Sequence, residues 1–204
     1  MASGKGSLFV ISAPSGSGKT TVCQRTLEAT PDLAYSISYT TRRSRSNEKD
    51  GVDYVFLSDE KFTEMREHGE FLEWALVHAH YYGTSKKQID ECLSSGRDIL
   101  LDIDVQGARK VRDSMPDAVL VFILPPSFEI LEERLRRRQS DEEEAIRRRL
   151  ANARDEIKAI REYDYIIIND DLDDAVRKFT SIIQAERCRR HRMLPFLDWL
   201  SFQG

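Results

Sequence analysis

Four short apolar runs lie at intervals along the chain, at residues 8–11, 99–103, 119–124 and 165–168. None of them shows the regular alternation of apolar and polar residues that is expected of a strand with one face in water. Continuous apolar runs of this length are typical of strands that are covered on both faces, as in a parallel sheet. The pattern therefore predicts a parallel sheet in which these four strands are fully buried.

Segments in which apolar residues recur at helical spacing lie between these runs. In the last of them, Val176, Phe179 and Ile183 fall on one face. The predicted helices cover residues 19–29, 105–114, 128–138 and 173–189. Alternating strands and helices predict an α/β fold with right-handed crossovers and with helices on both faces of the sheet.

Residues 36–84 interrupt this alternation with strand and turn signals. The strands expected here cover residues 35–40, 54–57 and 71–80. A short helix is expected between Ser58, which is a suitable N-cap, and Gly69, which is suited to the position just past the helix. The segment therefore predicts a small lobe inserted between elements of the main sheet.

Residues 126–160 are mostly charged helix with few apolar anchors, which is typical of a mobile lid. The pattern breaks near Gln139. Because Ser140 and Glu143 fit a capping box, we expect a second helix to begin at Asp141. An apolar stripe runs along this helix and consists of Ile146, Leu150, Ala153, Ile157 and Ile160.

The stripe also sets the orientation of the arginine run 147–149. At about 100° per residue, Arg149 lies about 60° from Ile146, at the edge of the stripe, whereas Arg148 points nearly opposite. Only Arg149 is therefore expected to face inward from this run.

The chain has 204 residues, which suits one domain with embedded subdomains. We divide it into a core (1–35, 85–125 and 161–192), the lobe (36–84), the lid (126–160) and a tail (193–204). Its 31 lysines and arginines against 35 acids give a net charge of −4, which argues against general nucleic-acid binding. Arginines gather at 42–45, 134–138 and 147–149, and such patches suit small, highly charged anions.

Three cysteines lie far apart in the sequence, which indicates reduced thiols. The N-terminal apolar stretch is too short for a signal peptide, and the longest uncharged apolar run, 118–124, is too short to cross a bilayer. We therefore expect a cytoplasmic protein without a membrane partner. The apolar tail beyond Met193 includes Asp198 and few cations, so docking on this domain or on a second copy is favoured over membrane binding, and a homo-oligomer is left open.

Residues 13–20, A-P-S-G-S-G-K-T, follow directly on the first apolar run and lead into the first predicted helix. The P-loop pattern requires a glycine, four residues and then Gly-Lys-Ser/Thr; Ala13 replaces the first glycine, and residues 18–20 complete the pattern. Glycines in the loop can turn successive N–H groups inward, Lys19 would reach the β- and γ-phosphates, and Thr20 would bind Mg²⁺. The placement disfavours a plain strand-to-helix turn and predicts a phosphate-binding loop.

Two arginines, Arg42 and Arg45, lie three residues apart in the predicted lobe, and Tyr54 and Tyr82 could add hydroxyl donors. A guanidinium group binds phosphate oxygens through paired hydrogen bonds. Such a set can hold a monophosphate with its acceptor oxygen directed at the P-loop. A solvated basic turn is the alternative.

Further motifs occur in an order and spacing that resemble the guanylate kinase family over residues 7–190. Besides the loop they are S-Y-T-T-R-R-S-R (38–45), G-V-D-Y (51–54), F-L-E-W (71–74), Y-Y-G-T (81–84), L-D-I-D-V-Q-G (101–107) and I-I-N-D (167–170). The resemblance implies a P-loop kinase fold with a parallel β-sheet core flanked by helices, an inserted GMP-binding lobe and a helical lid. It also implies reversible transfer of the γ-phosphoryl group of ATP to GMP or dGMP, with Mg²⁺, in purine nucleotide metabolism.

The resemblance assigns roles to the residues that match the family's motifs. Contacts to ATP are implied for Ala13, Pro14, Ser15, Gly16, Ser17, Gly18, Lys19, Thr20, Arg134 and Asn169, the last beside the adenine. The GMP phosphate would be held by Ser38, Arg42, Arg45, Tyr54 and Tyr82, and the guanine by Glu73, Thr84 and Asp104. The catalytic set would be Lys19, Arg42, Arg138 and Arg149, with Thr20 and Asp102 near the Mg²⁺.

Glu73 has an apolar context, between Phe71 and Trp74, where an unpaired carboxylate would be costly. A guanine edge offers two N–H donors to that carboxylate, whereas adenine offers a different face. A salt bridge between Glu73 and an arginine is the alternative.

Two functions other than a guanine-specific kinase fit parts of this sequence. A phosphopeptide-binding module on the same scaffold is disfavoured by the intact residues 18–20 and by the lid arginines, which binding alone does not need. A kinase for another monophosphate is disfavoured by Glu73 and Asp104. His78 and His80 fit packing within the lobe better than a metal site, because no further ligand motif lies nearby.

Overall fold

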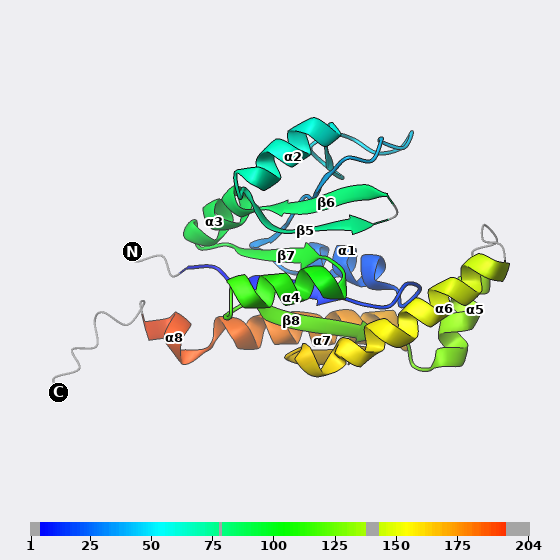
Figure 1. Cartoon of the computed structure of the whole chain (residues 1–204). Helices are drawn as coiled ribbons and strands as arrows, with labels where there is room; N and C mark the ends of the chain where they lie inside the picture. The colour runs from blue at the N-terminus through cyan, green and yellow to red at the C-terminus, as the bar shows by residue number, and fades with distance from the viewer. Residues whose placement is uncertain (1–4, 78, 138–142, 195–204) are drawn as a thin grey trace.

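The computed structural model describes residues 5–77, 79–137 and 143–194. A main sheet of five strands has helices on both faces, a second sheet of four strands lies beside it, and a pair of helices extends from the carboxyl end of the main strands (Figure 1). Within the described residues, no helix is long and apolar enough to cross a membrane.

The main sheet is parallel throughout, with the strand order β2-β7-β1-β8-β9. Its strands are β1 (Leu8–Ser12), β2 (Leu33–Tyr35), β7 (Asp98–Asp102), β8 (Val119–Leu124) and β9 (Tyr165–Ile168). In the central strand, Val10 pairs with Leu101 on one side and with Leu120 on the other. All four predicted strands are confirmed as strands of this sheet.

Two details of the sheet differ from the prediction. β9 is not fully buried: Ile166 and Ile168 are 53% and 50% exposed, because β9 is an edge strand whose other face, with Ile167 and Tyr165, packs on the core. The strand expected at 35–40 is divided between two sheets, since Tyr35 ends β2 and the chain then leaves the main sheet. Three residues are too few for a periodic pattern, so β2 was missed.

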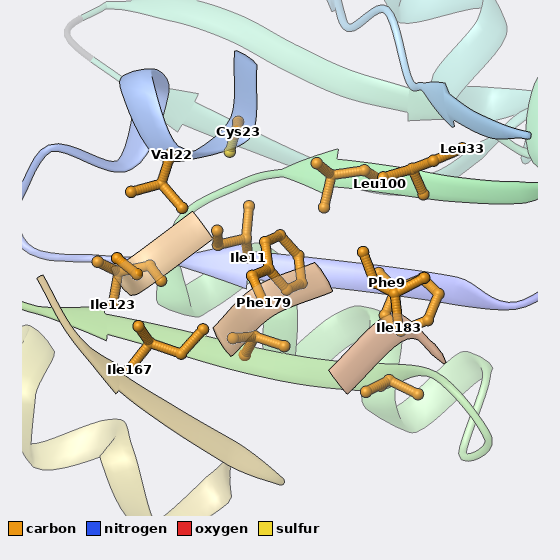
Figure 2. Packing of buried hydrophobic residues seen from close by; sticks show 13 residues of the cluster. Phe9, Ile11, Val22, Cys23, Leu33, Leu100, Ile123, Ile167, Phe179 and Ile183 are labelled. Atoms are coloured by element: carbon orange, nitrogen blue, oxygen red, sulfur yellow. The ribbon is translucent and has the colours of Figure 1, made fainter. Parts of the chain in front are cut away.

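Helices cover both faces of the main sheet. α1 (Lys19–Ala29) and α7 (Leu172–Arg187) pack on one face, where the rings of Phe9 and Phe179 meet edge-on with centroids 6.5 Å apart (Figure 2). α3 (Lys86–Ser94) and α4 (Val105–Ser114) pack on the other face, against Leu8 and Val10. Because successive residues of β1 point to opposite faces, a strand between two helical layers must be apolar at every position.

The predicted helices are confirmed, to the residue for α1 and α4 and within two residues for α7. α3 was not predicted, although its buried side chains Ile89, Cys92 and Leu93 lie at helical spacing. A short helix, α8 (Arg190–Met193), follows α7. The tail from residue 195 lies outside the described residues.

The second sheet belongs to the inserted lobe and has the strand order β4-β3-β6-β5. Its strands are β3 (Tyr39–Thr40), β4 (Val55–Phe56), β5 (Phe71–Val77) and β6 (His80–Ser85). α2 (Asp59–Glu67) packs on it through Phe62, whose ring stacks on that of Phe71 with centroids 4.4 Å apart. The predicted ends of α2 are confirmed: the Ser58 hydroxyl accepts a hydrogen bond from the Lys61 N–H at 3.2 Å, and Gly69 follows with φ +68°.

The single strand expected at 71–80 is instead a hairpin of β5 and β6. The chain reverses beside Ala79, which adopts φ +65°. Alanine gives no sequence signal for a turn of this kind, because glycine or asparagine normally supplies a positive φ. The hairpin therefore could not be recognised from the sequence.

The lid consists of α5 (Phe128–Arg136) and α6 (Glu143–Lys158), followed by the 3₁₀ helix η1 (Ala159–Glu162). Ile146 and Ala153 of the predicted stripe are buried in a small cluster with Leu131 and Leu135 of α5. The expected helix start at Asp141, with its capping box, lies outside the described residues. α5 ends at Arg136, with Arg137 as its C-cap, two residues before the end of the predicted helix 128–138. The described part of α5 and α6 agrees with the predicted pair of helices.

Candidate active site

The loop between β1 and α1 has the backbone shape that the sequence predicts for a phosphate-binding loop. Gly16 and Gly18 adopt φ values of +93° and +86°, which favour glycine. The Ser17 N–H donates to the Pro14 carbonyl at 3.1 Å, and Gly18 is the N-cap of α1. Ala13 packs against the core cluster of β1 and α7 without disturbing the loop. The N-terminus of α1 thus places the positive end of a helix dipole at this loop.

Asn169, the residue after β9, supports this loop through a side-chain hydrogen bond. Its Nδ2 donates to the Ser17 carbonyl at 2.7 Å, and the side chain is buried. A carbonyl oxygen can only accept, so the amide nitrogen must face the loop. A Cβ at Gly18 would lie 2.4 Å from that nitrogen, so a second constraint besides φ requires glycine there.

Lys19 is the first residue of α1, and its side chain reaches the carboxyl end of β7. Its Nζ forms an ion pair with Asp102 Oδ1 and approaches the Ile103 carbonyl at 3.4 Å. Burial opposes the charge of the ammonium group, but Asp102 outweighs it, so the pKa of Lys19 is raised above its ordinary value. Lys19 is therefore a fixed cation at the mouth of the loop.

A second cationic centre forms in the lobe around Arg42. Its two terminal nitrogens donate to Glu48, each at 2.9 Å, and its Nε donates to the Tyr82 hydroxyl at 3.3 Å. The guanidinium carbon lies 5.2 Å from the ring centroid of Tyr54. The Arg45 backbone N–H donates to Glu48 at 2.8 Å, whereas the Arg45 side chain is exposed. The structure thus brings together Arg42, Tyr54 and Tyr82, which the sequence assigned to one anion.

Ser38 lies close to this centre along the backbone: its carbonyl accepts from the N–H of Val55, the residue after Tyr54, at 2.9 Å. Glu48 was not predicted. An acid six residues after an arginine in a polar turn has no distinguishing pattern in the sequence.

The three residues assigned to the guanine also come together. Glu73 and Thr84 are a cross-strand pair of β5 and β6, and the Thr84 hydroxyl donates to Glu73 Oε1 at 2.7 Å. Asp104 is the N-cap of α4, and its Oδ1 accepts from the Gly107 N–H at 2.8 Å. A Cβ at Gly107 would lie 3.0 Å from Glu73 Oε2, so α4 closes against this carboxylate.

Glu73 is 6% exposed, and its electrostatic setting is unusual for a carboxylate. Burial raises its pKa, the hydrogen bond from Thr84 and the charge of Lys110 oppose that effect, and Asp104 adds to it. In the described part of the chain no arginine forms a salt bridge with Glu73, so the structure does not support the alternative of an arginine partner. A buried carboxylate with one neutral donor is suited to a ligand that brings further N–H groups.

The lid contributes two of the three assigned arginines within the described residues. Arg134 donates to the Asn169 carbonyl at 3.1 Å, and Asn169 is the residue whose side chain is bonded to the P-loop. Arg149 is half-buried while Arg147 and Arg148 are exposed, as the helical phase predicts. Arg138 lies outside the described residues.

Glu156 of α6 is a further group at the loop that the sequence did not indicate. It is half-buried, and burial raises its pKa, while the charge of Lys19 and a hydrogen bond with the Ser15 backbone oppose that shift. The lid helix therefore already reaches the P-loop through a carboxylate.

No group of three or more His, Cys, Asp and Glu side chains is arranged to hold a metal ion by itself among residues 5–77, 79–137 and 143–194. His80 lies in β6, and His78 is outside the described residues.

A sequence model of the guanylate kinase family matches residues 5–186. The chain is 53% identical over 188 residues to a guanylate kinase of Syntrophotalea carbinolica, an alignment that covers 92% of this chain and 90% of that protein. It is 49% identical over 199 residues to a guanylate kinase of Aromatoleum aromaticum, covering 96% and 98%. The crystal structure of guanylate kinase from Anaplasma phagocytophilum superposes with a TM-score of 0.80 at 34% identity, covering 99% and 98% of the two chains.

Proposed function

The chain belongs to the guanylate kinase family, and we propose that the residues described above bind its two nucleotides and stabilise the transferring phosphoryl group. The protein is an ATP:GMP phosphotransferase, which transfers the γ-phosphoryl group of ATP to GMP and gives ADP and GDP. One observation above all supports the residue assignment. Asp102 pairs with Lys19 of the P-loop, and Asp104, two residues later, lies close enough to Glu73 for their charges to interact.

ATP is placed on the P-loop side of β7. The loop N–H groups from Ser15 to Thr20 and the N-terminus of α1 would cradle its phosphates, and Lys19 would exchange Asp102 for the β- and γ-phosphates. Arg134 and Arg149, with Arg138, would approach from the lid. Adenine is placed beside Asn169.

GMP is placed on the lobe side of β7. Its phosphate would lie against Arg42, Arg45, Ser38, Tyr54 and Tyr82, and its base against Glu73, Thr84 and Asp104. Ionised Glu73 can accept both the N1–H and the 2-amino group of guanine, with charge assistance. The assigned contacts go to the phosphate and the base and not to the sugar, so dGMP is included as an acceptor.

The chemical step requires positioning and charge neutralisation rather than a protein nucleophile. The GMP phosphate oxygen is already ionised at neutral pH, so no general base is needed. Holding it in line with the γ-phosphorus converts a bimolecular reaction into an effectively unimolecular one. Lys19 and the lid arginines would stabilise the negative charge on the transferring group.

Mg²⁺ is the expected partner of ATP in this family's reaction, and we assign it to Thr20 and Asp102. Mg²⁺ takes one or two protein ligands and completes its shell with water and phosphate oxygens. A threonine hydroxyl in the first turn of α1 and a carboxylate at the mouth of the loop fit that donor set. The ion would neutralise phosphate charge when bound.

A coupled assay for ADP release tests this function, with ATP, Mg²⁺ and each of GMP, dGMP, AMP, CMP, UMP and dTMP. GMP and dGMP are expected to support turnover, and the other four to give at most a hundredth of the GMP rate, because the buried Glu73 would face unmatched groups. Comparable turnover with AMP would contradict the base site. GMP binding without any turnover would favour a binding module. ATP and GMP are cytoplasmic metabolites, which supports a cytoplasmic location.

A further inference from the structure

The guanidinium group of Arg42 is held on nearly every side before any phosphate arrives. Besides the two bonds to Glu48 and the bond from Nε to Tyr82, one terminal nitrogen also donates to the Arg43 carbonyl at 2.8 Å. Arginine has five N–H groups. Within the described residues, four of the five have an acceptor, which leaves one for a ligand.

Glu48 is equally constrained. Its Oε2 accepts from the Arg45 backbone N–H at 2.8 Å, and its own N–H donates to the Arg45 carbonyl at 3.0 Å. The Arg42 and Glu48 side chains are 14% and 13% exposed, whereas residues 43–47 between them are exposed. The hydrogen bonds from Arg42, followed by that from Arg45, lower the pKa of Glu48 to about 2. Glu48 therefore joins the two ends of an exposed turn as a permanent anion.

We propose that Glu48 is a positioning residue for the GMP phosphate: it holds Arg42 and the turn that carries Arg45 in the arrangement that receives the phosphate. The inference rests on the proposed placement of that phosphate at Arg42. A free arginine side chain has many rotamers, and ordering them at the moment of binding would weaken the affinity. A bidentate carboxylate removes this cost in advance, because it fixes the plane of the guanidinium group.

The structure also allows the opposite hypothesis, in which Glu48 is a stand-in anion that the phosphate displaces. Displacement would leave two groups without partners: the Glu48 carboxylate, which is only 13% exposed, and the Arg45 N–H. A glutamate carboxylate is ionised near neutral pH, so the displaced group would remain an unpaired anion. The two hypotheses predict opposite signs for the same variant.

Steady-state kinetics of Glu48→Gln distinguish them. Glutamine keeps the shape and the bond from Arg45, but it loses the charge and turns an N–H toward the guanidinium group. We expect KM for GMP to rise about tenfold, while KM for ATP and kcat stay within about twofold. Glu64→Gln is the matched control, because Glu64 lies in the same lobe and forms an exposed ion pair with Lys61; its kinetics should equal those of the wild type.

A double-mutant cycle with Arg42→Met shows whether Glu48 acts through Arg42. In the Arg42→Met background, Glu48→Gln should raise KM for GMP by less than about twofold. KM does not depend on the concentration of active enzyme, so a partly folded preparation still tests the inference.

An unchanged or lowered KM for GMP in Glu48→Gln, or an equal rise in both KM values, would overturn the inference. If Arg42→Met alone left KM for GMP unchanged, the placement of the phosphate itself would be wrong. Loss of GMP affinity in Arg42→Met but not in Glu48→Gln would reject the role of Glu48 and leave that placement standing.

Discussion

At the residue scale, Asn169 links the P-loop to Arg134 of the lid. The family resemblance implies a place beside the adenine, and the structure shows Nδ2 bound to the Ser17 carbonyl and the Asn169 carbonyl bound by Arg134. If Asn169 supports the loop, it contributes to phosphate binding for any donor nucleotide, whatever its base. If Asn169 recognises adenine, it contributes only to the binding of donors that carry this base. The two roles can be separated by changing the base of the donor.

Asn169→Ala should lower kcat/KM for ATP and for ITP by a similar factor, about tenfold to a hundredfold, because an unpaired Ser17 carbonyl disturbs the loop for both. KM for GMP should not change. Asn152→Ala is the control, since Asn152 is exposed on α6. A selective loss with ATP, which leaves ITP unaffected, would show that Asn169 recognises adenine and does not support the loop.

Glu73 is the residue at which the proposed function and the stability of the fold conflict. Its pKa is raised by burial, so the folded state holds the proton more tightly than the unfolded chain does. The free energy of unfolding therefore falls as the pH rises from the ordinary glutamate range through the raised pKa, and it stays lower at neutral pH. Ionised Glu73 destabilises the empty enzyme.

We therefore expect Glu73→Gln to raise the midpoint of thermal unfolding at pH 7. Glutamine still accepts from Thr84 and carries no buried charge. The gain should shrink as the pH falls below the raised pKa, where the wild-type carboxyl group is protonated as well. Calorimetry of both proteins over a pH series measures this difference. A gain that is equal at all pH values, or a loss at pH 7, would show that the ionised carboxylate is not a source of instability.

At the scale of elements, the helical phase of α6 determines which of its neighbouring arginines are exposed and which is half-buried. Arg149 lies at the edge of the stripe that packs on α5, and it is half-buried, whereas Arg148 is exposed on the far side. The two residues have the same chemistry and adjacent positions, so they are matched to each other.

Arg149→Ala should lower kcat by roughly a thousandfold, because an arginine that neutralises a transferring phosphoryl group contributes on that scale. Arg148→Ala should leave kcat within about twofold, as expected for a solvated charge. Single-turnover measurements with saturating ATP and GMP compare the two variants directly. Equal losses would mean that α6 presents a different face to the site.

The sequence predicts elements well where a continuous pattern is long enough. β1 and β8 follow from continuous apolar runs of four residues or more, and α1 and α4 follow from apolar residues at helical spacing. It failed at three other places: β2 is three residues of an outer strand, α3 is a helix of only nine residues, and the β5–β6 turn places an alanine at positive φ. In these places the stabilising contacts come from segments that are distant in the sequence, so the local sequence gives no sign of them.

At the scale of the whole molecule, residues far apart in sequence meet at the carboxyl end of the parallel strands. Lys19 follows β1, Asp102 and Asp104 lie at the end of β7, and Asn169 follows β9. Ligands of α/β sheets bind at this edge. The sequence predicts that the P-loop and Lys19 lie at this edge, because one short motif, residues 13–20, directly follows the apolar run of β1.

The partners of these residues could not be predicted in the same way. Glu48 reaches Arg42 across a turn, Glu156 reaches the P-loop from the lid, and Asn169 supports Ser17 across a sequence distance that no local pattern spans. Long-range hydrogen bonds and charge interactions depend on where the chain returns, which only the three-dimensional structure shows. The sequence therefore suggested the residues that we propose contact the nucleotides, whereas residues that hold those side chains in place, such as Glu48 and Glu156, are recognised only in the structure.

The central claim is that two separate sites share the end of β7, with Glu73 selecting guanine on one side and the P-loop holding ATP on the other. KM for both substrates in Glu73→Gln tests it most directly. Glutamine replaces one acceptor by a donor, so one guanine N–H would meet an N–H. The account predicts that KM for GMP rises about tenfold to a hundredfold, while KM for ATP stays within about twofold. An unchanged KM for GMP, or equal damage to both substrates, would contradict it and would leave Glu73 as a structural residue of the lobe.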